Sequence, residues 1–75
     1  MAKLRRLSAR EVIAILTAHG FVEARQRGSH IALQATDEDD KTPTVIVPNH
    51  KEIRTGTLRS IIRQSQLPRE LFESE

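Results

Sequence analysis

Three histidines are the side chains of this chain that can exchange protons near neutral pH, and His30 has the most suggestive neighbours. It lies in the stretch RQRGSHIAL (residues 25–33), directly after a Gly-Ser pair and close to Arg25 and Arg27. Arginines attract a phosphate and stabilise the negative charge that develops when it is attacked. The stretch therefore indicates proton-transfer chemistry on a phosphodiester. An exposed strand histidine without a function is the alternative that this local pattern leaves open.

The other two histidines have different settings. His19 stands at the expected end of a helix, where a cation suits the helix dipole, and we interpret it as structural or merely exposed. His50, in VPNHKE, lies in a loop after a strand; loops often carry function, but a polar loop residue without a role fits equally well. The residues beside His30 and His50 that we expect to bind phosphate are Arg25, Arg27, Ser29 and Lys51.

Metal and cofactor sites find little support in the sequence. The histidines have no close pairing and cysteine is absent, so no zinc-ligand spacing exists. The acidic run DEDD (37–40) lacks the glycine and the ligand periodicity of a dedicated calcium loop. The three glycines, at 20, 28 and 56, form neither a phosphate-binding loop nor a dinucleotide fingerprint. We expect neither a metal nor a cofactor.

Capping and periodicity predict a helix over residues 9–19. Ser8 with Glu11 three residues later has the spacing of a capping box, and Gly20 suits a left-handed C-terminal cap. The apolar stripe of this helix is Ala9, Val12, Ile13 and Leu16. A second amphipathic helix is predicted in TLRSIIRQSQL (57–67), with Thr55 or Thr57 as N-cap, and LPRELF can add a last helical turn. Its inward residues are Leu58, Ile61 and Ile62, and Leu71 and Phe72 pack back from the last turn.

Between the helices the sequence predicts three strands. FVEARQR (21–27) and HIALQA (30–35) alternate on either side of a Gly28-Ser29 hairpin turn, and TVIV (44–47) is a β-branched strand that Pro48 ends. A two-residue loop gives the pairs Arg27–His30, Arg25–Ala32 and Glu23–Gln34 on one face, and Gln26–Ile31, Ala24–Leu33 and Val22–Ala35 on the other. The first face is polar and basic, and a slip of one residue would mix the two.

This order of elements predicts a two-layer α+β fold: a helix, a three-stranded antiparallel sheet, a second helix and a short C-terminal helical turn. The helices cover the apolar face of the sheet, and His30 lies on the open face. At 75 residues the chain forms one domain, residues 1–75. The absence of cysteine rules out disulfides and thiolate chemistry, and no segment resembles a signal peptide or a membrane span. We expect a cytoplasmic protein.

The net charge of +2 conceals an asymmetry. Residues 1–36 carry +4 and residues 42–67 carry +3, whereas residues 37–41 (DEDDK) carry −3 and residues 68–75 carry −2. The body of the fold is thus basic, as in small nucleic-acid-binding proteins, although a solvated charged surface would look the same. The chain has two Phe and neither Trp nor Tyr, so it offers no aromatic platform on which bases could stack. We therefore expect its contacts to RNA to be with phosphates and 2′-hydroxyls.

Three motifs in order resemble the HicA toxin family, also called YcfA-like: GF(x)6GSH at 20–30, VPNHKEI at 47–53 and GTLRSII at 56–62. The likeness covers roughly residues 8–72. It implies a fold similar to the double-stranded RNA-binding domain and the activity of an mRNA interferase without a known metal requirement. It also implies that His30, in Gly-Ser-His, is catalytic, and that a HicB-like antitoxin binds the toxin in a hetero-oligomer and blocks its site. The acidic DEDDK departs from many relatives; it can repel RNA locally or meet a basic antitoxin surface.

His30 would then act as general base on a ribose 2′-hydroxyl, giving a 2′,3′-cyclic phosphate, or as general acid on the leaving 5′-oxygen. Two other readings stay open. One is a non-catalytic double-stranded RNA-binding module with the same fold, although a pure binder would favour Lys or Arg where the histidine stands. The other is a degenerate family member that serves only as a regulatory partner.

Overall fold

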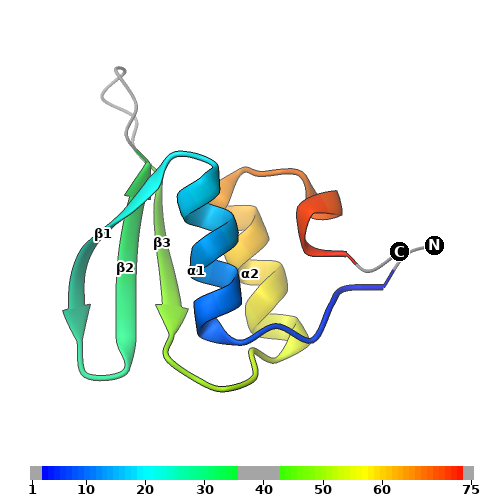
Figure 1. Ribbon diagram of the computed structural model, residues 1–75, viewed down its shortest axis with the longest axis horizontal. Helices are drawn as coiled ribbons and strands as arrows, with labels where there is room; N and C mark the ends of the chain where they lie inside the picture. Colours follow the sequence, from blue (N-terminus) through cyan, green and yellow to red (C-terminus); the bar gives the residue numbers. More distant parts are fainter. Residues whose placement is uncertain (1–2, 36–42, 74–75) are drawn as a thin grey trace.

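The computed structural model describes residues 3–35 and 43–73, and it confirms the predicted order of elements (Figure 1). The helices and strands are α1 (Ala9–Ala18), β1 (Phe21–Arg27), β2 (His30–Ala35), β3 (Thr44–Pro48) and α2 (Thr55–Ser65), followed by a 3-10 turn, η1 (Arg69–Phe72). The sheet is antiparallel in the order β1-β2-β3. The predicted acidic loop DEDDK lies outside the described residues. The fold class is therefore α+β, as expected from the sequence.

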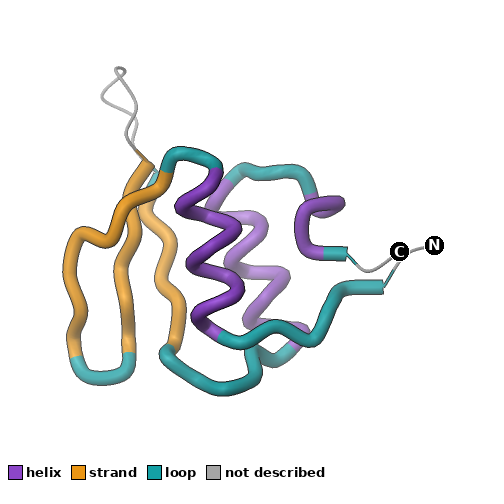
Figure 2. The backbone as a smooth tube through the Cα atoms, in the orientation of Figure 1, coloured by secondary structure: helices purple, strands orange, loops and turns teal. Residues whose placement is uncertain are grey.

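Both helices pack beside the sheet, α1 against β1 and β3 and α2 against β3 (Figure 2). The fully buried side chains come mainly from the predicted helix stripes and from β2 and β3: Val12, Leu16, Leu33, Val45, Val47, Leu58 and Ile61. In β1 only Phe21 is buried, and the other six residues of this strand are exposed. The core thus lies under β2 and β3, and β1 extends beyond the helices.

The N-terminus of α1 has the predicted capping box. The Ser8 hydroxyl accepts a hydrogen bond from the Glu11 amide at 3.2 Å, and the Glu11 carboxylate accepts one from the Ser8 amide at 3.0 Å. The bond from the Ser8 amide, assisted by the Ser8 hydroxyl and by nearby Arg5, holds the pKa of Glu11 below its usual value of 4.5. A lowered carboxylate pKa stabilises the fold above pH 4.5, and this contribution is lost as the pH falls through the lowered pKa.

Replacing Ser8 with alanine is expected to destabilise the protein by about 1 kcal/mol, because one amide of the first helical turn loses its acceptor. For a domain of this size such a loss lowers the melting temperature by roughly 4–8 °C. Thermal unfolding followed by circular dichroism at neutral pH measures the difference. Ser8→Asn, which retains an N-cap acceptor, is the control, and an unchanged melting temperature in Ser8→Ala would contradict the role of the cap.

The hairpin of β1 and β2 has the predicted register at the turn but not at its far end. Arg27 pairs with His30 and Arg25 with Ala32, as expected, but a β-bulge between Glu23 and Arg25 shifts the rest of the strand. Consequently Phe21 pairs with Ala35 and is buried, with 2% of its surface exposed.

The predicted pairs Glu23–Gln34, Ala24–Leu33 and Val22–Ala35 are therefore wrong. Glu23 pairs with Leu33 on the helix side of the sheet, and Val22 faces outward with 49% of its surface exposed. The physical reason is parity. A regular strand cannot place both Phe21 and Gln26 on the face of Ile31, whereas one extra residue restores the phase and buries the large aromatic ring.

The N-cap predicted for α2 is also wrong. The helix begins at Thr55 with Arg54 as its N-cap, and no side chain caps it. Just before this point the Ile53 amide donates to the Leu7 carbonyl at 2.7 Å, and the Ile53 side chain is buried. Tertiary packing of residue 53 therefore sets where the chain enters the helix and overrides the local preference for threonine at the cap.

The chain ends of the fold are held together by main-chain contacts. The Arg5 amide donates to the Phe72 carbonyl at 2.8 Å, and Leu4 forms an antiparallel bridge with Glu73. Phe72 is fully buried, which confirms that the predicted last turn packs back on the core. Over residues 3–35 and 43–73, none of the helices has the length and apolar character that crossing a membrane requires.

Candidate active site

His30 is the first residue of β2, directly after the tight turn of the hairpin. The turn is possible because Gly28 has a φ of +55°, a conformation that other residues rarely adopt. His30 is exposed and pairs with Arg27 across the hairpin, while Arg25 lies two residues farther along the same strand and is also exposed. The structure therefore brings the histidine and the two arginines to one end of the sheet, on the face away from the core.

The helix α2 borders the open face of the sheet beside His30. The sequence predicted the helix but not this placement. His30 pairs with Pro48 of β3, and the Ile46 amide at the outer edge of β3 donates to the Gln64 side chain of α2 at 3.2 Å. Side chains from the two strands, the loop after β3 and α2 line an open pocket of about 380 Å³, which we call the histidine pocket. Its lining residues are His30, Ile46, Pro48, His50, Thr57, Ser60, Ile61 and Gln64.

His50 therefore shares this pocket with His30, although 19 residues separate them in the sequence. Main-chain hydrogen bonds hold His50 in place: its amide donates to the Pro48 carbonyl at 2.8 Å, and its carbonyl accepts from the Ala9 amide at 3.0 Å. The adjacent Asn49 amide donates to the carbonyl of Ser29, in the hairpin turn. The loop after β3 is thus tied both to the start of α1 and to the residue before His30.

The three imidazole rings differ in their hydrogen bonds. The Nδ1 atom of His19 lies 2.8 Å from the Ile15 carbonyl oxygen, so this nitrogen donates to the last turn of α1, which favours the structural alternative for this exposed residue. Among the described residues, the rings of His30 and His50 make no such bond. Within the described part of the chain, these ring nitrogens are therefore available to contact a ligand.

Arginines lie next to the histidine pocket, in β1 and in α2. Arg25 and Arg27 form no ion pair within the described part of the chain, whereas Arg5, Arg6 and Arg69 are paired with glutamates at 4.0, 3.9 and 2.7 Å. A further arginine that the sequence analysis missed is Arg63 of α2, whose guanidinium donates to Ser60 at 3.3 Å on the pocket wall. The inward stripe of Leu58, Ile61 and Ile62 leaves Arg63 on the outer face of α2, but it gives no sign that this face adjoins His30.

The other predicted phosphate-binding residues lie nearby but not in the pocket. Ser29 is exposed in the hairpin turn, and Lys51 lines a separate hollow of about 180 Å³. That hollow is also lined by Ser8, Arg10, Asn49 and His50. Since His50 borders both cavities, Lys51 and Arg10 continue the basic surface from the histidine pocket toward α1.

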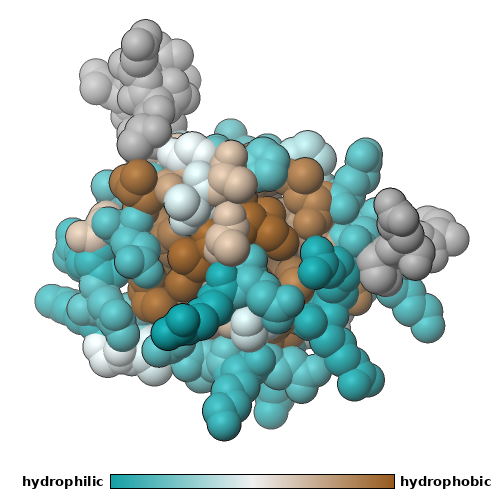
Figure 3. All heavy atoms as spheres, viewed as in Figure 1, coloured by the Kyte–Doolittle hydropathy of each residue, from teal (hydrophilic) through white to brown (hydrophobic). Residues whose placement is uncertain are grey.

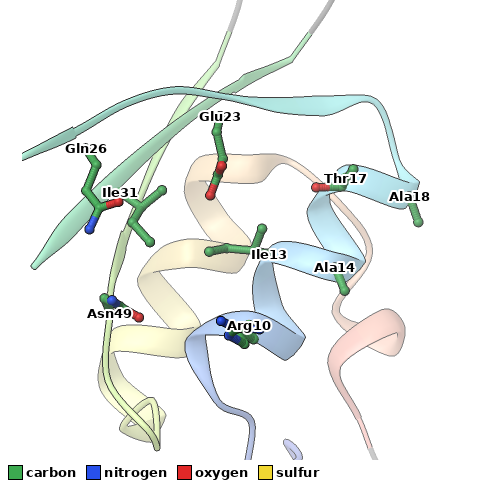
Figure 4. A pocket seen from close by; sticks show the side chains of 9 residues that line it. All are labelled: Arg10, Ile13, Ala14, Thr17, Ala18, Glu23, Gln26, Ile31 and Asn49. Atoms are coloured by element: carbon green, nitrogen blue, oxygen red, sulfur yellow. The ribbon is translucent and has the colours of Figure 1, made fainter.

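A larger groove, of about 740 Å³, lies on the opposite side of the sheet, between α1 and the overhanging β1 (Figure 4). Glu23 and Ile31 point into it from the strands, and Ile13 and Thr17 line it from α1 (Figure 4). Apolar side chains gather in the middle of this face, with hydrophilic ones around them (Figure 3). Among the described residues that line the groove there is no histidine, and its charged side chains, Arg10 and Glu23, have opposite signs, so the groove has no net positive charge to attract a phosphate. The smaller histidine pocket is therefore the better site for phosphodiester chemistry.

Comparison with known proteins agrees with the motifs. No curated protein matches the sequence. A sequence model of the family described as the HicA toxin of bacterial toxin–antitoxin systems matches residues 9–67, from the start of α1 to just beyond α2. The match includes both histidines of the pocket and every strand of the sheet. Since it covers most of the 75 residues, the chain belongs to the HicA toxin family.

Proposed function

We propose that this toxin is an endoribonuclease that cleaves mRNA without a metal ion and uses His30 for proton transfer. The observation that carries the proposal is the position of His30: exposed, opposite Arg27 in the hairpin, and in the wall of a pocket of about 380 Å³. Ligand pockets typically have volumes of about 300–1,000 Å³, so a phosphate with part of its nucleotide is a reasonable occupant.

The chemistry follows from the groups at this place. Arg25 and Arg27 attract the RNA backbone and stabilise the charge that builds up on the phosphate, and Ser29 and Lys51 extend the contacts along the strand. His30 takes the proton of a ribose 2′-hydroxyl or gives one to the leaving 5′-oxygen. Attack by the 2′-oxygen leaves a 2′,3′-cyclic phosphate on one product and a 5′-hydroxyl on the other.

The proposed partner is a HicB-like antitoxin that covers the site in a hetero-oligomer. Membership of a toxin–antitoxin family supports such a partner in general. His30 is exposed and the histidine pocket is open to solvent. An inhibitor must therefore cover this basic surface by direct contact, as a bound antitoxin would. Co-purification of the toxin with the product of a neighbouring reading frame, and loss of cleavage in the complex, would support this partner.

Purified protein incubated with an RNA and with the DNA of the same sequence tests the activity. We expect the RNA to be cut in the presence of a chelator, with cyclic phosphate and 5′-hydroxyl ends, and the DNA to stay intact because it has no 2′-hydroxyl. Analysis of the product ends by mass spectrometry is the measurement. Cleavage of the DNA, or dependence on an added metal, would contradict the mechanism. RNA that is bound but left intact would favour the double-stranded RNA-binding module instead.

A further inference from the structure

We propose that His50 is a second proton-transfer group, and that His30 and His50 act on one phosphodiester as an acid–base pair. This inference rests on the proposed ribonuclease function. It starts from the finding that both histidines line the histidine pocket, His30 from the start of β2 and His50 from the loop after β3. A single positioned histidine can serve only one side of the reacting phosphate at a time, whereas two can serve the attacking and the leaving oxygen together.

The loop that carries His50 is fixed in a way that suits such a role. Its main chain bonds to Pro48 and Ala9, and the neighbouring Asn49 amide bonds to Ser29, the residue before His30. These bonds join the two histidine-bearing segments directly. Because they use backbone atoms only, they hold the position of His50 without occupying its ring. A catalytic residue needs a backbone that is held in place and a side chain that is free to contact the reacting atoms.

The pocket between the histidines offers the contacts that a nucleotide needs. Thr57 and Ser60 supply hydroxyls and Gln64 an amide, and the Arg63 guanidinium reaches Ser60 at 3.3 Å. Ile46, Pro48 and Ile61 provide the apolar part of the wall. Polar groups that can hydrogen-bond phosphate and ribose oxygens thus alternate with apolar surface on which a sugar can lie.

The reaction balances without any further reactant. One histidine starts neutral and takes the proton from the ribose 2′-hydroxyl as the 2′-oxygen bonds to phosphorus. The other starts protonated and gives its proton to the 5′-oxygen as the bond between phosphorus and that oxygen breaks. The products are a 2′,3′-cyclic phosphate and a 5′-hydroxyl, and the two rings have exchanged their protonation states. Proton exchange with water then returns each ring to its starting state, and the net number of protons on the pair is unchanged.

Such a pair predicts a bell-shaped dependence of kcat/KM on pH, because cleavage requires one ring neutral and the other protonated. The charged groups next to the pair are Arg27, opposite His30 in β1, Arg63 of α2, whose guanidinium reaches Ser60, and Lys51 and Arg10 in the hollow that His50 also lines. Among the described residues, no carboxylate lines either the histidine pocket or that hollow. The two limbs of the profile should therefore belong to the two histidines, and removing one histidine should remove one limb.

The experiment compares wild-type protein with His30→Ala and His50→Ala on two RNA substrates, one normal and one with sulfur in place of the leaving 5′-oxygen. A thiol has a pKa near 8.5, so a sulfur leaving group departs without being protonated. On the normal RNA we expect both variants to lose about 10²–10⁴-fold in kcat/KM. On the sulfur-containing RNA, the variant that lacks the acid should recover close to the wild-type rate, and the variant that lacks the base should stay slow.

His19→Ala is the matched control, because it removes a histidine from the end of α1, outside the pocket, and should keep full activity. Thermal unfolding checks that each variant is folded, and recovery on the sulfur substrate is itself proof of a folded site. If His50→Ala cleaves normal RNA fully, or if neither variant recovers on the sulfur substrate, the pair is wrong while the proposed function stands. If wild-type protein cleaves neither substrate, the proposed function fails and the pair with it.

Discussion

Alanine at position 30 is expected to lower RNA cleavage by about 10²–10⁴-fold, the usual contribution of one positioned proton-transfer group. Expression of the variant should no longer arrest growth. RNA affinity should change little, because the arginines that attract the backbone remain. Folding should be unaffected, because the His30 side chain is exposed and makes no hydrogen bond within residues 3–35 and 43–73. Single-turnover cleavage and filter binding on the same preparation measure the two properties separately.

Two comparisons sharpen this prediction. Arg27→Ala should weaken RNA binding and reduce its dependence on salt, because a cation opposite His30 is lost while the proton-transfer group stays. His30→Ala should show the reverse, with near-normal binding and lost chemistry. Wild-type cleavage by purified His30→Ala would end the assignment of His30, and equal losses of binding and cleavage would make it a contact residue only.

Alanine in place of Phe72 is expected to destabilise the protein by about 3–5 kcal/mol, the cost of removing a large buried ring and leaving a cavity. Phe72 is fully buried although it lies in a short 3-10 turn near the end of the chain. At roughly 0.05–0.15 kcal/mol per residue, a domain of this size has a total stability of about 4–11 kcal/mol. The substitution therefore removes a large part of it, and urea unfolding followed by circular dichroism gives the difference.

Leu71→Ala is the matched control, because this neighbour is only half-buried and should cost clearly less. A loss below about 1 kcal/mol in Phe72→Ala would show that the C-terminal turn is not part of the core. The result also bears on the family, since the match to the HicA toxins ends at residue 67. A large effect would mean that the core of this protein depends on a segment outside the matched region.

Much of the fold follows from features that lie close together in the sequence. The capping box of Ser8 and Glu11, the left-handed Gly20 and the Gly28 turn each need only a few neighbouring residues, and all three were predicted correctly. Period-two alternation placed β1 and β2 at their observed bounds. The pairing of Arg27 with His30 followed, since a two-residue turn fixes the register of the pairs next to it.

Predictions failed where a distant contact outweighed a local preference. The bulge in β1 arises because burying Phe21 is worth more than an unbroken alternation, and its result is that Glu23 faces the helix side and Val22 faces water. The N-cap of α2 moved to Arg54 because residue 53 is held by Leu7, from the other end of the chain. Neither cause is visible within a window of ten residues.

The candidate site divides in the same way. Sequence alone determined that His30 stands in a basic hairpin, because turn chemistry and strand alternation are local and fix which side chains share a face. Only the tertiary structure decided that His50 and the outer face of α2 with Arg63 join it around one pocket. The physical reason is that contact between a strand, a loop and a helix depends on how the helix packs against β3, and that packing is settled by the whole core at once.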